Sequence, residues 1–364
     1  MQGLKDDADA VRHFRFPQKI ISAIPYGHGH INKTYLLTDE AGERYILQRI
    51  NKNAFPDPPA VMENIAGVTA HLRAAFAARG EDPQRRVPHL LPALDGRYWY
   101  RDANLEYWRV YGFIPRTRVF RRTDNPAIFA AAGSAFGLFC RMLEDYPTNT
   151  LHTTVPRFHD TPHRMAQLDA AVAADACGRV HAVRRELAEA YAFRDVCATL
   201  TDMCEAGVLP LRVTHNDTKL SNVLFDEASD TALCVVDLDT VMPGLIACDF
   251  GDAIRAGANA ADAEEKELSK VALRLDMYEA FAQAYLYALK PVLTAAEAEA
   301  LPMGALLMTL ECGLRYLTDY ISGDVYFQPA WDGQNLQKAR VQLRLALDMQ
   351  KKRDDMLRIT SRLI

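Results

Sequence analysis

The sequence lacks several features that would assign it to particular classes of protein. It contains no CxxC pair, no low-complexity tract and no run of 18 apolar residues. A helix needs about 20 consecutive apolar residues to cross a bilayer, so no membrane-spanning helix and no membrane partner are predicted. The first residues, MQGLKDDADAVRHF, also lack an apolar core of the kind found in export signals. The predicted location is therefore the cytoplasm.

The sequence also lacks an excess of basic residues. It has 42 Lys and Arg against 47 Asp and Glu, which gives a formal net charge of −5. Broad binding to nucleic acid requires a basic face that neutralises phosphates, so no nucleic-acid partner is predicted. Nothing in the sequence indicates a protein partner. An anionic ligand would have to be held by local cations, backbone amides or a metal ion.

Cysteine is present without the spacing of a structural framework. The seven cysteines are odd in number and dispersed from Cys140 to Cys312, mostly among apolar or helical residues. This pattern favours small buried side chains in a reducing compartment over a disulfide framework or a zinc site.

What is present is sufficient material for a protein of two lobes. The chain has 364 residues, of which 49% are hydrophobic and 24% charged. From residue 20 to about 111, short β-prone runs surround one amphipathic pattern at 61–76. After residue 113, helical periodicity dominates, apart from a β-rich segment at 211–240. The helical periodicity covers 126–143, 163–176, 183–206, 264–289, 303–321 and 333–357.

The predicted fold class is therefore α+β. We expect a small β-rich N-terminal lobe at 1–113, a hinge near 111–118 and a larger helical lobe at 114–364. The helical lobe would carry the most informative motif, at 213–222, and the apolar run that ends at residue 237.

That motif reads VTHNDTKLSN and fits the pattern H-x-D-x-x-x-x-N, and an apolar run then ends at Asp237. Phosphoryl transfer requires a carboxylate that accepts a hydrogen bond from the attacking hydroxyl, and oxygen ligands that hold Mg²⁺ against the phosphates. We therefore predict an ATP-dependent kinase with Asp217 as catalytic base and with Mg²⁺ held by Asn222 and Asp237. The alternative is a polar turn whose side chains only cap the loop.

Neighbouring residues have predicted supporting roles. Lys219, two residues after the base, is a predicted catalytic residue that offsets charge on the transferred phosphoryl group. His215 is interpreted as a structural residue that braces the loop. A DFG triplet begins at Asp249, but it does not follow an apolar strand. Asp249 and Asp252 are therefore predicted to stabilise the catalytic loop rather than to form the metal site.

A glycine-containing segment, GHGHIN at 27–32, separates two β-prone runs near the start of the chain. Glycine lets backbone amides approach phosphate oxygens closely, so Gly27, His28, Gly29 and His30 are predicted to bind the nucleotide. A G-x-G turn is also an ordinary hairpin connection, and the motif alone does not separate the two interpretations.

The segments HNDTKLSNVLFD and VVDLDTVMPG resemble the aminoglycoside phosphotransferase and choline kinase group, which has a protein-kinase-like bilobal fold. Within that group, further stretches are most similar to bacterial N-acetylhexosamine 1-kinases. They are YGHGHINKTYLL, YILQRINKNAFPDPPAVMENI, VPRFHDTPHR, DFGDAIRAGAN and LRYLTDYISGDVYF. The resemblance extends from about residue 20 to 330.

The resemblance implies roles for individual residues. Asp217 matches the catalytic base of the group, and Asn222 and Asp237 match its metal ligands. Residues 27–32 match the loop over the nucleotide phosphates. Phe113 and Ile114 lie in the matching hinge, 108–115, which presents backbone groups to adenine.

The resemblance also implies an acceptor site. Arg315, Asp319 and Tyr320 fall in the helical segment that faces the sugar in such enzymes. Asn32 is a further candidate for binding sugar hydroxyls, or alternatively fixes its own loop. An ion pair remains the alternative for Arg315, and a packing role remains the alternative for Tyr320.

One position departs from the usual kinase pattern. Kinases carry a lysine on the third strand that binds the α- and β-phosphates. Here the corresponding residue is Gln48, and strand alternation directs Arg49 to the opposite face. Gln48 remains a predicted nucleotide ligand without charge, so either Arg49 replaces the lysine or metal and backbone amides hold the phosphates. Glu63, on the following helix, then lacks its usual lysine partner.

The leading hypothesis is transfer of the γ-phosphoryl group of ATP to the anomeric hydroxyl of N-acetylglucosamine or N-acetylgalactosamine. This hydroxyl is more acidic than an ordinary alcohol, so a carboxylate base suffices. One alternative is a kinase for choline, homoserine, an aminoglycoside or another hexose. The alternative of another class is a pseudokinase that binds nucleotide or sugar without turnover, and Gln48 is the one feature that favours it.

Overall fold

The computed structural model describes residues 8–27 and 31–364. The packing of Cα atoms divides these residues into two compact units, each built from segments that are separated in the sequence. The first unit contains the described residues of Met1–Arg118 together with Asp145–Pro156 and Val223–Pro243. The second contains Val119–Glu144, Arg157–Asn222 and Gly244–Ile364. The proposed division of the chain at residue 113 stays a prediction.

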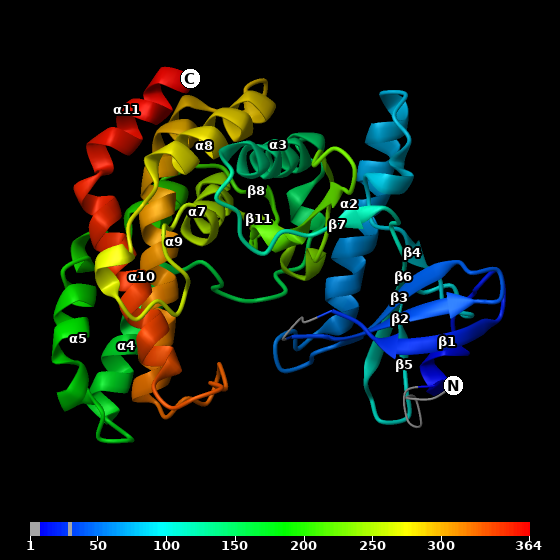
Figure 1. Cartoon of the computed structure of the whole chain (residues 1–364), viewed down its shortest axis with the longest axis horizontal. Helices are drawn as coiled ribbons and strands as arrows, with labels where there is room; N and C mark the ends of the chain where they lie inside the picture. Colours follow the sequence, from blue (N-terminus) through cyan, green and yellow to red (C-terminus); the bar gives the residue numbers. More distant parts are fainter. Residues whose placement is uncertain (1–7, 28–30) are drawn as a thin grey trace. The chain divides into compact units, whose positions relative to one another are not determined.

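The centre of the first unit is an antiparallel sheet, drawn in blue to cyan in Figure 1. Its strand order is β1-β2-β3-β6-β4, and β5 pairs with β6. The strands are β1 (Ile20–Pro25), β2 (Lys33–Asp39), β3 (Arg44–Ile50), β4 (Leu90–Leu91), β5 (Tyr100–Arg101) and β6 (Tyr107–Gly112). The hairpin predicted around the turn at 39–42 is present as β2 and β3, with Tyr35 opposite Leu47.

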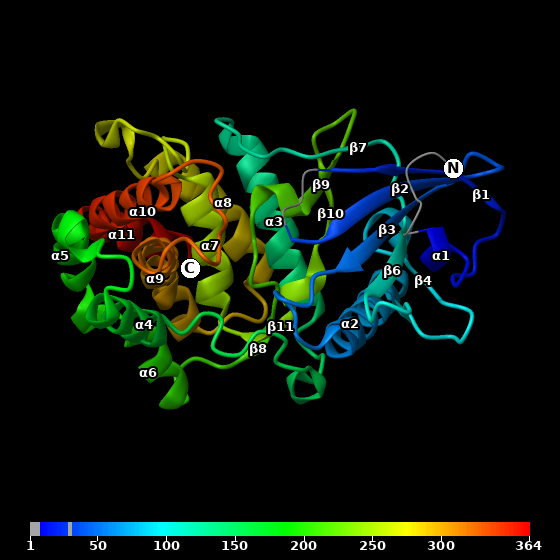
Figure 2. The same ribbon diagram turned by 90° about the horizontal axis from the view of Figure 1, so that it is seen from below.

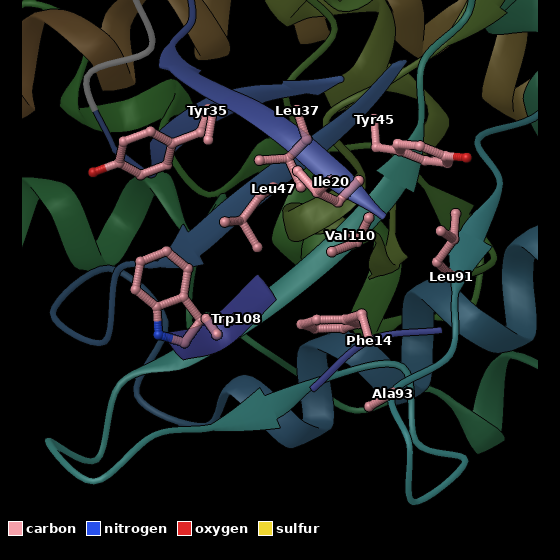
Figure 3. Close-up of a cluster of buried hydrophobic side chains, with 12 residues drawn as sticks. Phe14, Ile20, Tyr35, Leu37, Tyr45, Leu47, Leu91, Ala93, Trp108 and Val110 are labelled. Atoms are coloured by element: carbon pink, nitrogen blue, oxygen red, sulfur yellow. The ribbon is translucent and has the colours of Figure 1, made fainter. Parts of the chain in front are cut away.

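Alternation along these strands gives the sheet an apolar face. Leu37, Leu47 and Val110 are fully buried on neighbouring strands, and the short helix α1 (Ala8–Val11) contributes to the same cluster. Figure 3 shows these side chains converging with Phe14 and Trp108. Burial of this cluster stabilises the sheet on which the polar residues of the opposite face are mounted.

The helix α2 (Pro58–Ala78) follows β3. Its first turn is capped by Asp57, whose side chain accepts a hydrogen bond from the Ala60 N–H at 3.2 Å, and proline occupies the first turn. The apolar residues that predicted this helix are buried, from Val61 to Phe76. A 3₁₀ turn, Pro83–Arg85, lies between α2 and β4.

A smaller sheet completes the first unit, with strand order β10-β9-β7. Its strands are β7 (Thr117–Arg118), β9 (Val223–Asp226) and β10 (Ala232–Val235), and a 3₁₀ turn, Leu238–Thr240, and β11 (Met242–Gly244) follow. Asn64 of α2 holds two later segments of the first unit in place. Its Nδ2 donates to the carbonyls of His152 at 2.8 Å and Val241 at 2.9 Å.

The second unit is helical, apart from β8 (Arg212–Thr214) and the end of β11. Figure 2 shows its green to red helices around α9, which packs against α4, α7, α10 and α11, while α3 packs against α8. The helices are α3 (Pro126–Met142), α4 (Thr161–Ala174), α5 (Arg184–Tyr191), α6 (Thr199–Glu205), α7 (Ile246–Gly257), α8 (Leu275–Leu289), α9 (Ala295–Ile321), α10 (Gln334–Lys351) and α11 (Arg353–Leu363). Short 3₁₀ segments are Thr148–Thr150 in the first unit, and Val180–Val183, Arg194–Val196, Leu220–Asn222 and Leu268–Lys270 in the second. None of the described helices combines the length and apolar composition needed to cross a membrane.

The helical predictions differ from the structure in three places. The segment 183–206 contains two helices separated by a 3₁₀ turn. The helix expected from residue 264 begins only at Leu275, because Asn259 and Leu273 form an isolated β-bridge first. The helix α7 was not predicted, since its 12 residues include two glycines and lie directly after a strand. Gly251 and Gly304 permit close contact between α7 and α9, where a Cβ on either glycine would overlap the backbone of the other helix.

Candidate active site

The loop that follows β8 carries the motif predicted to be catalytic. β8 is anchored at its start, where Arg212 donates to both oxygens of Glu297 at 2.6 and 2.9 Å, and Glu297 belongs to the capping box of α9. From Val213 to Leu220 every residue is buried except Asp217 and Lys219. The loop therefore exposes only the two side chains for which chemistry was predicted.

The Asp217 carboxylate is held by two neighbours. Its Oδ2 lies 2.9 Å from Lys219 Nζ and accepts a hydrogen bond from Asn222 Nδ2 at 3.0 Å. The same Nδ2 donates to the backbone carbonyl of Asp217 at 2.8 Å. These contacts fix the orientation of the carboxylate, as a base that must accept a hydrogen bond from the attacking hydroxyl requires.

Asp249, at the start of the DFG triplet, braces this loop from α7. Its carboxylate accepts the N–H groups of His215 at 2.8 Å and Asn216 at 2.6 Å, and its carbonyl accepts the Thr218 hydroxyl at 2.5 Å. Burial raises the pKa of Asp249, although His215 and the two N–H groups act in the opposite direction. The prediction that Asp249 stabilises the loop is confirmed, whereas Asp252 pairs with Arg255 at 2.9 Å.

Two histidines also support the loop. His215 packs edge-on against Phe136 and Phe139, and its Nδ1 accepts the Asp217 N–H at 3.3 Å. This agrees with its predicted bracing role. His159, which precedes α4, lies with Nε2 3.1 Å from the Asn216 carbonyl and Nδ1 3.3 Å from Glu311 of α9. Burial disfavours the charge of His159, but the Glu311 carboxylate raises its pKa overall.

Asp237 lies in the first unit, immediately beyond β10. It has a left-handed backbone conformation with φ 63° and begins the buried turn Leu238–Thr240. Its side chain is exposed, whereas the three residues of the turn are buried. An exposed carboxylate on a buried turn is well placed to bind a ligand.

Gln48 is half-buried on β3 and hydrogen-bonded on both sides. Its Nε2 donates to Thr34 Oγ1 at 3.2 Å, and its Oε1 accepts from Arg109 Nε at 3.0 Å. Arg109 is its cross-strand partner on β6 and forms a buried ion pair with Asp239. Sequence reasoning missed Arg109 and Asp239, although an arginine between Trp108 and Val110 in an apolar strand was a usable signal.

The predicted nucleotide loop is only partly within the described residues. His28, Gly29 and His30 lie outside them. Gly27 has a φ of 78°, the left-handed conformation that favours glycine. Asn32, predicted to bind sugar, donates from Nδ2 to Asp239 at 2.6 Å and accepts the Asn51 N–H at 3.0 Å. Its contacts are those of a residue that fixes the end of the loop.

The hinge residues predicted to face adenine follow β6. The Phe113 N–H donates to the Arg44 carbonyl at 3.0 Å, and the Arg44 guanidinium lies 4.0 Å from the Phe113 ring centre. Ile114 is buried and its carbonyl accepts the Thr117 hydroxyl at 3.0 Å. Glu63 of α2, for which no role was predicted, pairs with His152 at 2.7 Å.

Three of the residues predicted to bind the acceptor, Arg315, Asp319 and Tyr320, lie near the end of α9 in the second unit. The Arg315 guanidinium lies 5.5 to 5.9 Å from the rings of Phe158, Tyr326 and Phe327. Asp319 accepts the N–H groups of Tyr326 at 2.8 Å and Phe327 at 3.0 Å, so it fixes the chain that carries two of these rings.

The ring of Tyr320 has a different neighbour. Arg179 lies over it at 4.5 Å and donates to its carbonyl at 2.7 Å. Arg315 and Tyr320 therefore contact different residues, and Arg315 is the one surrounded by aromatic rings.

The donor chemistry of the predicted metal ligands fits Mg²⁺. Asn222 donates from its Nδ2 to Asp217 and carries an amide oxygen as well, and Asp237 has an exposed carboxylate. Amide and carboxylate oxygens are the ligands that hard divalent cations prefer.

Comparison with known proteins gives these residues a context. Residues 22–299, more than half of the chain, match the phosphotransferase enzyme family. The chain belongs to this family.

Solved structures of other phosphotransferases share the fold of this one. An aminoglycoside phosphotransferase from Alicyclobacillus acidocaldarius is 14% identical, with a TM-score of 0.61 over 100% of this chain and 98% of that one. A microcompartment-associated aminopropanol kinase is 17% identical, with a TM-score of 0.58 over 96% and 97% of the two chains. An amicoumacin kinase, solved with AMP-PNP and Ca²⁺, is 14% identical, with a TM-score of 0.58 over 95% and 94%.

These likenesses confirm the predicted fold class for this phosphotransferase. It has an antiparallel N-terminal sheet and a helical C-terminal part, as kinase-like phosphotransferases do. The predicted activity is confirmed at the level of a small-molecule phosphotransferase. The resemblance to the aminoglycoside phosphotransferase group is likewise confirmed.

Proposed function

We propose that this phosphotransferase transfers the γ-phosphoryl group of ATP to the anomeric hydroxyl of an N-acetylhexosamine, with Asp217 as the base. The observation that carries the proposal is the Asp217 carboxylate, accessible on an otherwise buried loop and held by Lys219 and Asn222. A silent binding protein has no chemical need for a base fixed in this way.

The roles of the side chains follow from their chemistry. Asp217 accepts the proton of the acceptor hydroxyl, and the Asn222 hydrogen bonds orient its carboxylate. Lys219 sets a positive charge beside the reacting oxygen, which offsets negative charge as the phosphoryl group transfers. Asn222 and Asp237 would hold Mg²⁺, which neutralises charge on the phosphates when bound.

The surroundings of Arg315 support a neutral, hydroxyl-rich acceptor. Burial and the nearby charge of Arg315 lower the pKa of Arg164, so two guanidinium groups lie in one region of the second unit. Phe158 and Phe327 provide apolar ring surface beside Arg315. A sugar uses both features, because its hydroxyls and acetamido oxygen accept hydrogen bonds and its C–H faces pack on rings.

An amino-alcohol acceptor is the second candidate. The similarity to an aminopropanol kinase motivates it, and so does one oxygen of Glu311, Oε2, which is buried without a hydrogen-bond partner among the described residues. A carboxylate can bind a substrate ammonium group. Against this candidate, Arg164 and Arg315 would repel a cation in the same region.

The test is ³¹P NMR of products formed from Mg-ATP with N-acetylglucosamine, N-acetylgalactosamine, galactose, choline and aminopropanol in separate reactions. We expect a phosphate signal coupled to the anomeric proton with the N-acetylhexosamines. Asp217→Asn should abolish it, whereas Asp195→Asn, an exposed aspartate of the same unit, should not. Turnover of aminopropanol or choline alone would show that an amino alcohol is the acceptor in place of the sugar. An active Asp217→Asn enzyme would overturn the proposed role of Asp217 as the base.

Arg315→Met provides a second test of the acceptor. Loss of a hydrogen bond from a charged group should raise KM for the sugar by about 10-fold or more, without changing KM for ATP. An unchanged sugar KM in a folded variant would remove Arg315 from the acceptor site.

A further inference from the structure

The first unit contains a buried positive charge next to the position where the kinase lysine is missing. Gln48 of β3 stands at that position, and its cross-strand partner on β6 is Arg109. The Arg109 side chain is 1% exposed, and its Nε donates to Gln48 Oε1 at 3.0 Å. A charge buried to this extent is costly unless it is paired, so its partner indicates its purpose.

The partner of Arg109 is Asp239, two residues after Asp237. The Asp239 side chain is 4% exposed and accepts from Arg109 Nη1. Its second oxygen accepts from Asn32 Nδ2 at 2.6 Å, at the end of the predicted nucleotide loop. Asp239 thus connects β6, the segment after β1 and the turn that begins at Asp237.

Asp237 begins the turn that contains Asp239, so the Arg109–Asp239 pair holds the chain two residues from the proposed metal ligand. Asp237 itself has a left-handed backbone, a conformation that persists in a non-glycine residue only when its surroundings hold it. The contacts that hold the buried turn Leu238–Thr240 include the Arg109–Asp239 pair.

We propose that Arg109 is a positioning residue for Asp237, and that it places a fixed positive charge from β6 beside the position where other kinases carry a lysine on the third strand. Gln48 orients the Arg109 guanidinium. The ion pair of Arg109 with Asp239 then fixes the turn that carries Asp237. This inference rests on the proposed role of Asp237 as a metal ligand. Since Nε and Nη1 are both engaged within the protein, Arg109 acts on the metal ligand rather than by gripping the nucleotide phosphates.

The proposal is tested by binding of AMP-PNP, measured calorimetrically with Mn²⁺ and separately in EDTA. We expect Arg109→Gln to weaken Mn²⁺ binding to the AMP-PNP complex by about 10- to 100-fold, as loss of a residue behind a metal ligand does. AMP-PNP binding in EDTA should be nearly unchanged. Arg109→Lys should be intermediate. The double variant Gln48→Lys with Arg109→Gln should recover part of the loss, because it returns a cation to β3.

Two further arginines of the same sheet complete the test, one as a control and one as the alternative source of the charge. Arg101→Gln removes an exposed guanidinium from β5 and should leave both affinities unchanged. Arg49→Gln tests the rival position on β3. If Arg49→Gln weakens AMP-PNP binding in EDTA while Arg109→Gln binds Mn²⁺ as the wild type does, the missing charge belongs to Arg49 and the proposal is wrong. A folded Arg109→Gln that loses AMP-PNP equally with and without metal also overturns it.

Loss of the buried partner could prevent Arg109→Gln from folding, which circular dichroism would detect. Gln48→Met then decides, because it removes the acceptor that orients Arg109 and leaves the Arg109–Asp239 pair in place. A several-fold weaker Mn²⁺ affinity supports the proposal, and an unchanged affinity overturns it. These measurements contain no acceptor, so they stand whether or not any sugar is phosphorylated. Asp237→Asn tests the metal role alone, since unchanged Mn²⁺ binding in that variant would refute the proposed metal ligand itself.

Discussion

Asn222 donates two hydrogen bonds to Asp217 from a single nitrogen, one to the carboxylate at 3.0 Å and one to the backbone carbonyl at 2.8 Å. This contact joins Asp217, the proposed base, to Asn222, a proposed metal ligand five residues later in the chain. A change that removes the Asn222 amide therefore removes one of the two contacts that hold the Asp217 carboxylate.

Asn222→Ala should therefore impair two properties together. We expect kcat to fall by about 100-fold through misplacement of Asp217, and the Mg²⁺ concentration for half-maximal rate to rise by about 10-fold or more. Initial rates as a function of Mg²⁺ measure both quantities. Asn104→Ala, at an exposed position, should change neither. A rate loss without any change in Mg²⁺ dependence would exclude Asn222 as a metal ligand.

Lys219→Met should reduce kcat with little effect on stability. The Lys219 side chain is 42% exposed, so its pairing with Asp217 contributes little to folding, and removal should change the free energy of unfolding by less than about 0.5 kcal/mol. Loss of the charge that offsets the transferring phosphoryl group should lower kcat by about 100-fold. Steady-state kinetics and thermal unfolding measure the two effects, with Lys290→Met as the exposed control. An unchanged kcat would show that Lys219 forms only a surface ion pair and has no catalytic role.

Stability should depend on pH through His159. The Glu311 carboxylate raises the pKa of His159 in the folded state despite its burial. A raised histidine pKa contributes stability that is fully present below the unfolded pKa of about 6.5 and is lost as pH rises through the folded pKa. Each unit of elevation contributes about 1.4 kcal/mol. Wild type should therefore exceed His159→Gln in stability by more at pH 6 than at pH 9.

Urea denaturation at the two pH values measures this difference. The charged groups that act on His159 are Glu311, Asp252 and Asp249, and all three are buried. His181→Gln, at an exposed histidine, should have little effect at either pH. A stability difference for His159→Gln that is the same at pH 6 and pH 9 would contradict the assigned ion pair.

Gly304→Ala should destabilise the second unit. A Cβ at this position would overlap the backbone of Ala247 in α7, so the helices must separate, at a cost of about 1–3 kcal/mol. Because α7 also carries Asp249, kcat should fall as well. Gly313→Ala, on the same helix, is the matched control, since its nearest neighbours are side-chain atoms at 3.2–3.4 Å. Equal stability losses in the two variants would show that the α7–α9 contact is not the cause.

Features encoded by local spacing could be predicted from the sequence. The helix α2 follows from apolar residues between Val61 and Phe76 at three- and four-residue intervals. The β2–β3 hairpin follows from its turn, and the loop after β8 follows from the offsets among its polar residues. The bracing role of Asp249 was also predictable, because Asp249 is not at the end of an apolar run as Asp237 is.

Features encoded by long-range contact could not be predicted. The pair of Arg109 and Asp239 joins residues 130 positions apart, and no local pattern specifies that pairing. The same is true of His159 and Glu311, which are 152 positions apart. The helix α7 escaped prediction because Gly251, unfavourable for an isolated helix, is required by tertiary packing.

The cross-strand contact between Gln48 and Arg109 has an evolutionary consequence. Arg109, the cross-strand neighbour of Gln48, forms its ion pair with a single carboxylate, that of Asp239. A lysine at position 48 would place a second cation beside the first, without an anion to match it. Across related sequences, positions 48 and 109 should therefore change together, with a lysine at the first where the second is uncharged.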